Sequence, residues 1–270
     1  QLNGHEPASA APSGEFYAET AVKNGFAYLS RYGPESGIVI YDVKDIDHPK
    51  FVGSVRLDEG FEPDVEVTDD GNWAFWETQR FPVSPTVPAI DPIANLPHGV
   101  HIVDIRDKAH PKDAGFTPVA PDGPHSITYA NISGEHYVFA SIYSWQYVGT
   151  SGLTPTLAPP MTQRETIYKL DTSRPIAQLT AVASYVDENA TEANPVMPQG
   201  GLFPHDVTIS VHPITNKTYA YIAYWDLGVV ILDVTDPAHP VKVGSATQFG
   251  AAPTREVHMA RQFPTLIDGK

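Results

Sequence analysis

The chain has 270 residues and a formal net charge of −15 at neutral pH, from 32 acidic against 17 basic residues. This acidity argues against nucleic acid as a partner, because lysine and arginine make most phosphate contacts. The absence of cysteine excludes disulfides and thiolate chemistry, and no apolar run is long enough to span a membrane.

The N-terminal part of the chain predicts a lead-in followed by two four-stranded units. Residues 1–15 are rich in Ala, Ser, Pro and Gly, which favours an extended segment ahead of a single domain over residues 16–270. Residues 16–56 contain four apolar runs of strand length without an insertion. Residues 61–119 repeat this pattern, with a long insertion from Phe81 to His98 between the second and third strands.

The C-terminal part predicts two more units and the start of another. Residues 122–186 form the third unit, which contains a second long insertion from Trp145 to Arg164. A polar insertion from Asp187 to Gly201 leads into the fourth unit, residues 203–249. Residues 255–270 begin like the first strand of a fifth unit.

The third and fourth strands of three units are copies of one another. Gly37–Gly53, Gly99–Gly115 and Gly228–Gly244 align without a gap, with an opening Gly, two Asp residues, a His-Pro pair and a closing Gly in the same places. Each copy has β-branched runs around an Asp- and Pro-containing turn, which predicts a hairpin. A four-stranded unit cannot bury both of its apolar faces alone, so successive units should stack as the blades of an all-β propeller.

The three copies, GIVIYDVKDIDHPKFVG, GVHIVDIRDKAHPKDAG and GVVILDVTDPAHPVKVG, resemble the LVIVD repeat. That repeat is found in extracytoplasmic bacterial and archaeal β-propellers, so the resemblance implies a secreted, periplasmic or cell-surface protein. A fainter resemblance to the selenium-binding (methanethiol oxidase) propellers rests on Pro204 to Val207, followed by Tyr224-Trp225 and Asp233-Val234. This second resemblance implies a copper-dependent oxidoreductase.

About four blades and one further strand do not make a closed ring by themselves. We therefore expect the chain to be part of a larger ring of six to eight blades. The missing blades would come from the remainder of the protein. The alternatives are a self-contained ring of four or five blades and two copies of the chain that close one ring together.

Propeller geometry divides the histidines into two groups. His48, His110 and His239 lie in the hairpin turns, where a structural role is expected. The second group stands at the starts of first strands and should point to the mouth of the central channel: His125, His205 and His258. Three converging imidazoles could bind copper or zinc. The alternative is that each bonds the backbone of the neighbouring blade.

Carboxylates and aromatic side chains are expected around these histidines. We predict Asp206 or Glu62 as a general base, and Asp206 alternatively as a group that orients a histidine or bonds the next blade. Aromatic walls are expected from four residues near the ends of second strands: Trp76, Tyr143, Tyr224 and Trp225. The three long insertions map to the same face, whereas His101 is expected to fill a strand face.

Two functions follow from this pattern. The first is an extracytoplasmic propeller that binds a small molecule or a protein partner on the insertion-bearing face. The second is a metal-dependent oxidoreductase with His125, His205 and His258 as ligands. Fold alone does not choose between them.

Overall fold

The computed structural model describes most of the four predicted units. The residues described are 16–33, 35–58, 60, 63–79, 97–120, 123–143, 145–147, 153–155, 163–190, 203–225, 227–246 and 257–261. Glu62, the lead-in 1–15 and most of the three insertions lie outside these residues.

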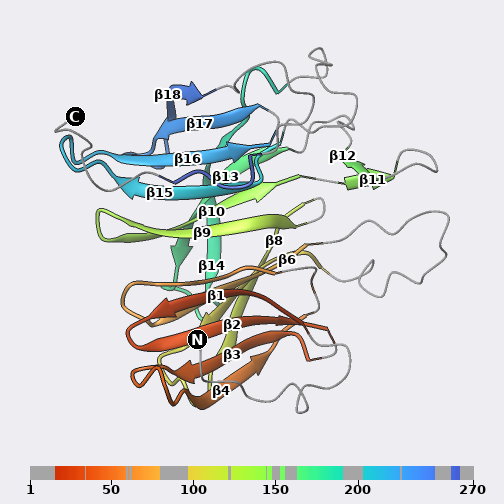
Figure 1. Cartoon of the computed structure of the whole chain (residues 1–270), viewed down its shortest axis with the longest axis vertical. Coiled ribbons are helices and arrows are strands. Elements are labelled where there is room, and N and C mark those ends of the chain that lie inside the picture. Colours follow the sequence, from red (N-terminus) through yellow and green to blue (C-terminus); the bar gives the residue numbers. More distant parts are fainter. Residues whose placement is uncertain are drawn as a thin grey trace. The chain divides into compact units, whose positions relative to one another are not determined.

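The described residues form four four-stranded antiparallel sheets and one two-stranded sheet (Figure 1). The first sheet has strands β1 (Phe16–Lys23), β2 (Phe26–Tyr32), β3 (Gly37–Asp42) and β4 (Lys50–Arg56). The second has β5 (Val65–Val67), β6 (Trp73–Thr78), β7 (Gly99–Asp104) and β8 (Lys112–Pro118). The third has β9 (Pro124–Ile132), β10 (Glu135–Ile142), β13 (Arg164–Asp171) and β14 (Gln178–Tyr185). The fourth has β15 (Asp206–Val211), β16 (Thr218–Tyr224), β17 (Gly228–Asp233) and β18 (Val241–Ala246).

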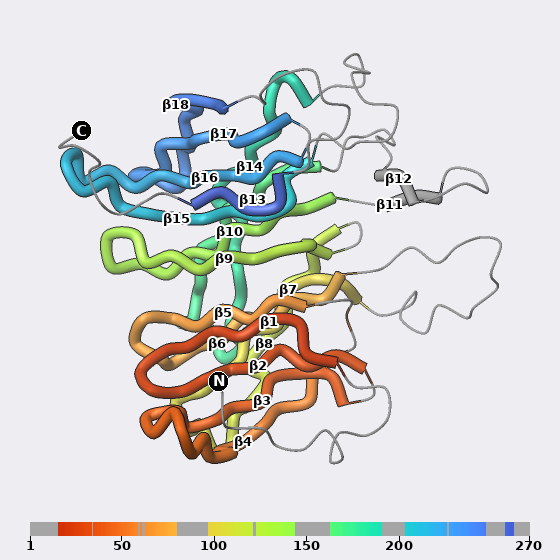
Figure 2. Tube along the Cα trace, in the orientation of Figure 1, coloured from red at the N-terminus to blue at the C-terminus, as the bar shows by residue number. Residues whose placement is uncertain are grey.

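Each four-stranded sheet is a meander, in which successive strands of the sheet lie side by side (Figure 2). In the third sheet, β11 and β12 lie between β10 and β13 in sequence but form a separate sheet. This order is the one expected of a propeller blade, and it confirms the predicted all-β fold. Among the described residues there is no helix that is long and apolar enough to cross a membrane.

The second insertion contains structure that the sequence pattern did not indicate. Trp145–Tyr147 (β11) and Leu153–Pro155 (β12) pair antiparallel as a separate hairpin. Its short strands carry no clear alternation of apolar and polar residues, so periodicity gave no signal for it.

The three repeated hairpins share one turn. In each, the backbone N–H of the histidine donates to the carbonyl of the first Asp of the turn, as in His48 to Asp45. The Nδ1 of the same histidine lies 2.9–3.1 Å from the Asp carboxylate in all three copies. These histidines are more than three-quarters exposed. The repeated Asp-x-x-His motif is therefore a turn lock on the protein surface, in the structural role expected for it.

The closing glycine of each repeat lies under a neighbouring turn where a neighbour is present. A Cβ at Gly53 would stand 2.5 Å from the carbonyl oxygen of Lys108 in the next hairpin, and a Cβ at Gly115 would stand 2.0 Å from that of Ala177. Real Cβ atoms do not approach backbone this closely, so only glycine lets the two blades meet.

By its contacts the chain divides into two compact units. The first contains residues 1–81, 90–124 and 171–179, and its core joins Tyr28, Ile38 and Ile40 of the first sheet to apolar side chains of the second. The second contains residues 125–170 and 180–270 with the short segment 82–89, and its core joins the third sheet to the fourth. Sequence analysis predicted one domain over these blades, and the third blade contributes residues to both units.

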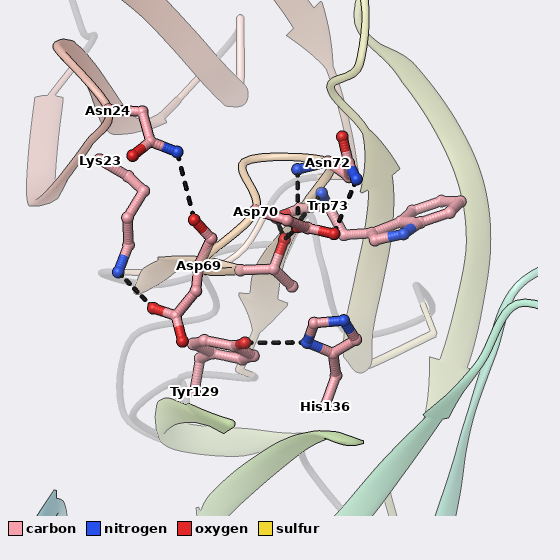
Figure 3. Close-up of polar contacts among 9 residues, drawn as sticks. Lys23, Asn24, Asp69, Asp70, Asn72, Trp73, Tyr129 and His136 are labelled. Carbon is pink, nitrogen blue, oxygen red and sulfur yellow. Dashed lines mark hydrogen bonds and ion pairs between the residues drawn. The ribbon is translucent and has the colours of Figure 1, made fainter. Parts of the chain in front are cut away.

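The turn between β5 and β6 shows how neighbouring blades of the first unit are tied at their loops (Figure 3). Lys23 donates to the carboxylate of Asp69 at 2.7 Å, and the side-chain amide of Asn24 donates to the Asp69 carbonyl at 3.2 Å. Asp70 accepts from the backbone N–H and the side chain of Asn72. The turn Asp69-Asp70-Gly71 is therefore held by its own side chains and by the first blade.

Candidate functional site

Three predicted metal-ligating histidines lie together in the second unit. His125 is the second residue of β9, His205 directly precedes β15, and His258 lies in the segment 257–261. That segment is held to the fourth sheet by an antiparallel bridge, in which the backbone N–H of Val257 donates to the carbonyl of Trp225 at 3.1 Å. His125, His205 and His258, which the sequence analysis assigned to the starts of first strands, therefore lie close to one another.

His205 is the middle member of this histidine cluster. Its Nε2 lies 3.1 Å from Nε2 of His125, and the two ring centroids are 4.5 Å apart. The ring centroid of His258 lies 4.1 Å from that of His205 on an exposed part of the chain. A nitrogen–nitrogen distance of 3.1 Å allows one ring to donate a hydrogen bond to the other when only one carries the shared proton.

Aromatic rings enclose the cluster. Tyr143 is fully buried and packs 4.8 Å from His125, while Trp225 stacks on His205 at 4.8 Å. Phe203, also fully buried, lies 4.2 Å from Tyr143 and 5.1 Å from Trp225. Of the predicted aromatic walls, Tyr143 and Trp225 are therefore at the histidines. Phe203 was missed, although it stands only two residues before His205.

Trp225 has an unusual backbone conformation. Its φ is +31°, in the left-handed region that large side chains seldom adopt. Such strain is concentrated at functional sites, where the surrounding structure holds it in place. Here the stacking on Phe203 and His205 and the bridge to Val257 fix the residue.

His125 and His205, the two inner histidines of the cluster, are held in the neutral form. Burial, and then the charges of His205 and His258, lower the pKa of His125 to about 3. Burial, and then the charge of His258, lower the pKa of His205 to about 4. Nδ1 of His205 is buried and makes no hydrogen bond of good geometry within the described residues, although the main chain of His258 lies close enough to favour the protonated ring. Neutral imidazole is the form that binds metal ions and accepts hydrogen bonds.

The histidine pair fits one metal ion, but the cluster as a whole does not form a complete coordination sphere. Two nitrogens bound to one ion at about 2.0–2.1 Å with a near-tetrahedral angle would be about 3.3 Å apart, close to the 3.1 Å found for His125 and His205. Among the described residues, however, no group of three or more His, Asp or Glu side chains is arranged to hold a metal ion. The ring of His258 lies tilted against that of His205 without completing such a group.

Asp206 bonds the neighbouring first strand. Its carboxylate accepts from the hydroxyl of Ser126 at 3.3 Å and from the backbone N–H of Val207 at 2.6 Å. The hydroxyl of Thr128 donates to the carbonyl of Val207 at 2.7 Å, so β9 and β15 are joined twice. Burial raises the pKa of Asp206. This geometry corresponds to the blade-bonding alternative stated for Asp206.

A buried acid near Asp206 was not predicted. Glu165 is 1% exposed, and Ser141, its direct partner across β10 and β13, donates to it at 2.8 Å. Burial raises the pKa of Glu165 to about 8, Ser141 opposes the shift, and the charge of Asp206 adds to it. A sequence signal for the burial of Glu165 was its position two residues before Ile167, which places both side chains on the same face of β13; Ile167 is buried.

The remaining predicted site residues lie elsewhere. Tyr224 is fully buried in the core of the second unit, where its hydroxyl accepts from the backbone N–H of Asp187. Trp76 is fully buried in the core of the first unit, so none of its surface is open to a ligand in this conformation. His101 is also buried there and lies between Asp113 and Asp58, at 3.1 and 3.6 Å. Glu62 lies outside the described residues.

Comparison with known proteins places the repeat and the fold. The model of the LVIVD repeat matches residues 216–248, which include the fourth-blade copy of the hairpin. No curated protein matches the sequence.

Solved structures that are similar to the chain have low sequence identity. A protein from Lactobacillus plantarum is 10% identical with a TM-score of 0.51, over 91% of this chain and 58% of that one. A hydrazine synthase from Kuenenia stuttgartiensis is 13% identical with a TM-score of 0.44, over 79% of this chain and 51% of that one. A hypothetical selenium-binding protein from Sulfolobus tokodaii is 11% identical with a TM-score of 0.37, over 86% of this chain and 61% of that one.

These similarities bear on the fold alone, and this chain spans little more than half the length of the first two proteins. The four meander sheets and the three aligned hairpins agree with the repeat match. The chain is an all-β propeller of four-stranded blades that carries the LVIVD repeat.

Proposed function

We propose that this propeller is an extracytoplasmic binding protein whose ligand is held at the histidine cluster of His125, His205 and His258. The observation that carries the proposal is the pair of neutral, part-buried imidazoles whose Nε2 atoms face each other at 3.1 Å. The extracytoplasmic location rests on the LVIVD repeat, which is typical of exported propellers.

The cluster favours a ligand that neutral nitrogen can bind. An anionic partner gains no ion pair from His125 or His205, since burial keeps both rings uncharged at neutral pH. A divalent transition-metal ion, or a ligand that offers hydrogen-bond donors, can bind the Nε2 lone pairs of both rings when each ring carries its proton on Nδ1. The exposed His258 forms the solvent side of the cluster, where a ligand would enter.

The second candidate is a metal-dependent oxidoreductase, favoured by the nitrogen–nitrogen distance of His125 and His205. These two residues would hold copper or zinc, and His258 would become a third ligand by a small movement of the segment 257–261. Bound copper would supply one-electron chemistry. The protein would contribute the enclosing rings of Tyr143 and Trp225, which limit access of water, and the carboxylate of Asp206, the residue that follows His205.

Metal content tests both candidates. We expect the purified protein, dialysed against Cu²⁺ or Zn²⁺ and then desalted, to retain about one equivalent by elemental analysis. His205→Ala should reduce this to below a tenth of an equivalent. His48→Ala is the matched control, because His48 is exposed in a hairpin turn and should leave binding unchanged.

The outcomes separate the two readings. Less than a tenth of an equivalent in the unaltered protein would rule out the oxidoreductase. Metal-free ligand binding would then be tested with phenol, whose hydroxyl group can donate a hydrogen bond to a neutral imidazole. The readout is the NMR chemical shift of the ring protons of His125 and His205. Unchanged shifts at saturating probe would contradict the binding proposal as well.

A further inference from the structure

The fourth sheet has a face that is covered in the other two repeat-bearing blades but open here. The three blades align residue for residue across their second, third and fourth strands. The aligned sets, each in direct cross-strand register, are Tyr28–Ile40–Gly53, Phe75–Ile102–Gly115 and Tyr221–Ile231–Gly244. A difference in solvent exposure between aligned residues therefore reflects a difference in what packs against the blade.

The aligned apolar residues are more exposed in the fourth blade than in the first and second blades. Ile40 and Ile102 are fully buried, as are Tyr28 and Phe75 of the same sets. Their counterparts in the fourth blade, Ile231 and Tyr221, are only part-buried. The difference is not one of side-chain type, because the isoleucine is identical in all three blades.

The closing glycines show the same difference at the backbone. Cβ atoms at Gly53 and Gly115 would meet carbonyl oxygens of the following hairpin at 2.5 and 2.0 Å. A Cβ at Gly244 would meet only the side chain of Ile231, at 3.8 Å. Gly244 therefore leaves room for the close approach of a neighbouring main-chain carbonyl, as Gly53 and Gly115 do, but no carbonyl of a described residue makes this approach.

Hydrogen bonds mark the place where a covering turn would bind. In the first unit, the backbone N–H of Ala177 donates to the carbonyl of Ala114 at 3.0 Å, and that of Leu179 to the hydroxyl of Thr117 at 2.9 Å. Both acceptors lie on β8, beside Gly115. No described residue makes the matching contacts to β18, and Val243 on that strand is 53% exposed.

We propose that this open face of the fourth blade, made by Tyr221, Ile231 and Gly244, is the seat of a further blade of the same polypeptide. That blade would enter through Val257 and place the main chain of its own hairpin turn over Gly244. The position of the chain after β18 supports this occupant, because Val257 bridges to Trp225 of the fourth blade. His258 there takes the position that His125 and His205 hold at the starts of their blades.

Thiol labelling tests the proposal, since residues 1–270 contain no cysteine and any cysteine elsewhere in the complete polypeptide can be replaced by serine. Ile231→Cys is prepared in residues 1–270 and in the complete natural polypeptide, with Val211→Cys as the control, because Val211 is 54% exposed on the same sheet. We expect Ile231→Cys to react at least about tenfold more slowly in the complete polypeptide, as burial restricts labelling to rare openings. Val211→Cys should react equally in both.

Three outcomes would overturn the proposal. Equal labelling of Ile231→Cys in both proteins would show that no blade covers the face. Protection that appears only as the concentration of residues 1–270 rises would make a second copy the occupant. A complete polypeptide that ends at Lys270 would leave no residues for the blade.

A second pair of variants remains informative if the cysteine protein folds poorly. In the complete polypeptide, Gly244→Val should lower the unfolding midpoint as Gly115→Val does, because both would clash with a covering turn. In residues 1–270, Gly244→Val should be silent. A silent Gly244→Val in the complete polypeptide would contradict the proposal, and neither result depends on ligand binding at the histidine cluster.

Discussion

The hydroxyl of Ser141 donates a 2.8 Å hydrogen bond to Oε2 of Glu165, while Oε1 of the same carboxyl group is buried and has no partner within the described residues. One hydrogen bond does not replace the hydration that an ionised carboxylate loses on burial. Glu165 therefore stays protonated, and its pKa rises to about 8.

This buried acid makes stability fall with rising pH. The pKa of Glu165 is higher in the folded than in the unfolded protein, so its contribution is complete below about pH 4.5 and is lost as the pH rises through about 8. The loss approaches roughly 1.4 kcal/mol per pH unit within this window. We expect Glu165→Gln to remove that slope from the free energy of unfolding measured in urea.

Glu135→Gln is the control for this experiment. Glu135 is 55% exposed and forms a surface ion pair with Lys169, so its loss should leave the slope unchanged. A Glu165→Gln protein with the slope of the parent would show that the buried carboxyl is ionised at neutral pH.

The inner histidines act in the opposite sense. Their folded pKa values lie below the ordinary value of 6.5, so the unfolded protein binds more protons between about pH 6.5 and pH 4. Stability is lost as the pH falls through this range. For His205 alone the loss is roughly 3 kcal/mol, from a shift of about two and a half units.

Ring proton titration by NMR measures this directly. We expect the rings of His125 and His205 to remain neutral down to about pH 4, whereas the exposed His48 serves as the reference in the same spectrum. His205→Phe should flatten the acid side of the stability profile. Titration of His205 near pH 6.5 would contradict the buried, neutral pair.

The fold was predictable because the same hairpin pattern occurs three times in the sequence. The aligned Gly, Asp and His-Pro markers fix the hairpins, and His125 and His205 follow from their place at the starts of first strands. Trp76 could not be assigned in this way. Trp76 stands near the end of a second strand, as Trp225 does. Its indole N–H, however, donates a hydrogen bond to Ser30 of the neighbouring blade. This burial of Trp76 depends on how the two blades pack and cannot be read from the sequence. Glu165 was missed for a related reason, since its effect depends on burial.

The Trp76–Ser30 contact gives a third prediction. Trp76 Nε1 donates to Oγ of Ser30 at 3.1 Å, and Ser30 donates in turn to the carbonyl of Pro63. Ser30→Ala leaves a buried indole N–H and a carbonyl without this partner, at a cost of about 1–3 kcal/mol in the free energy of unfolding. Ser54→Ala, at an exposed serine of β4, should cost nothing measurable. Equal unfolding midpoints for the two variants would show that water replaces the hydroxyl.

The last prediction concerns a buried ion pair at the start of the third insertion. The side chain of Asp187 is completely buried, and Lys242 of β18 reaches it at 2.8 Å. Burial opposes the charge of Asp187, but hydrogen bonds from Lys242 and its neighbours outweigh this and hold its pKa below the ordinary value. Lys242→Met keeps much of the side-chain volume and removes the positive charge, which leaves a buried carboxylate uncompensated. The expected loss is about 3–5 kcal/mol in the free energy of unfolding at neutral pH.

Lys23→Met is the matched control for Lys242→Met. Lys23 also forms a 2.7 Å ion pair, but Asp69 is 56% exposed, so the loss should be at most about 1 kcal/mol. Because an uncompensated Asp187 would protonate as the pH falls, the Lys242→Met deficit should shrink between pH 7 and pH 4, whereas the Lys23→Met deficit should change little. Denaturation in urea at both pH values measures the two deficits. Equal losses for the two variants would mean that Asp187 is hydrated or already protonated, and that Lys242 does not hold the insertion to the fourth blade.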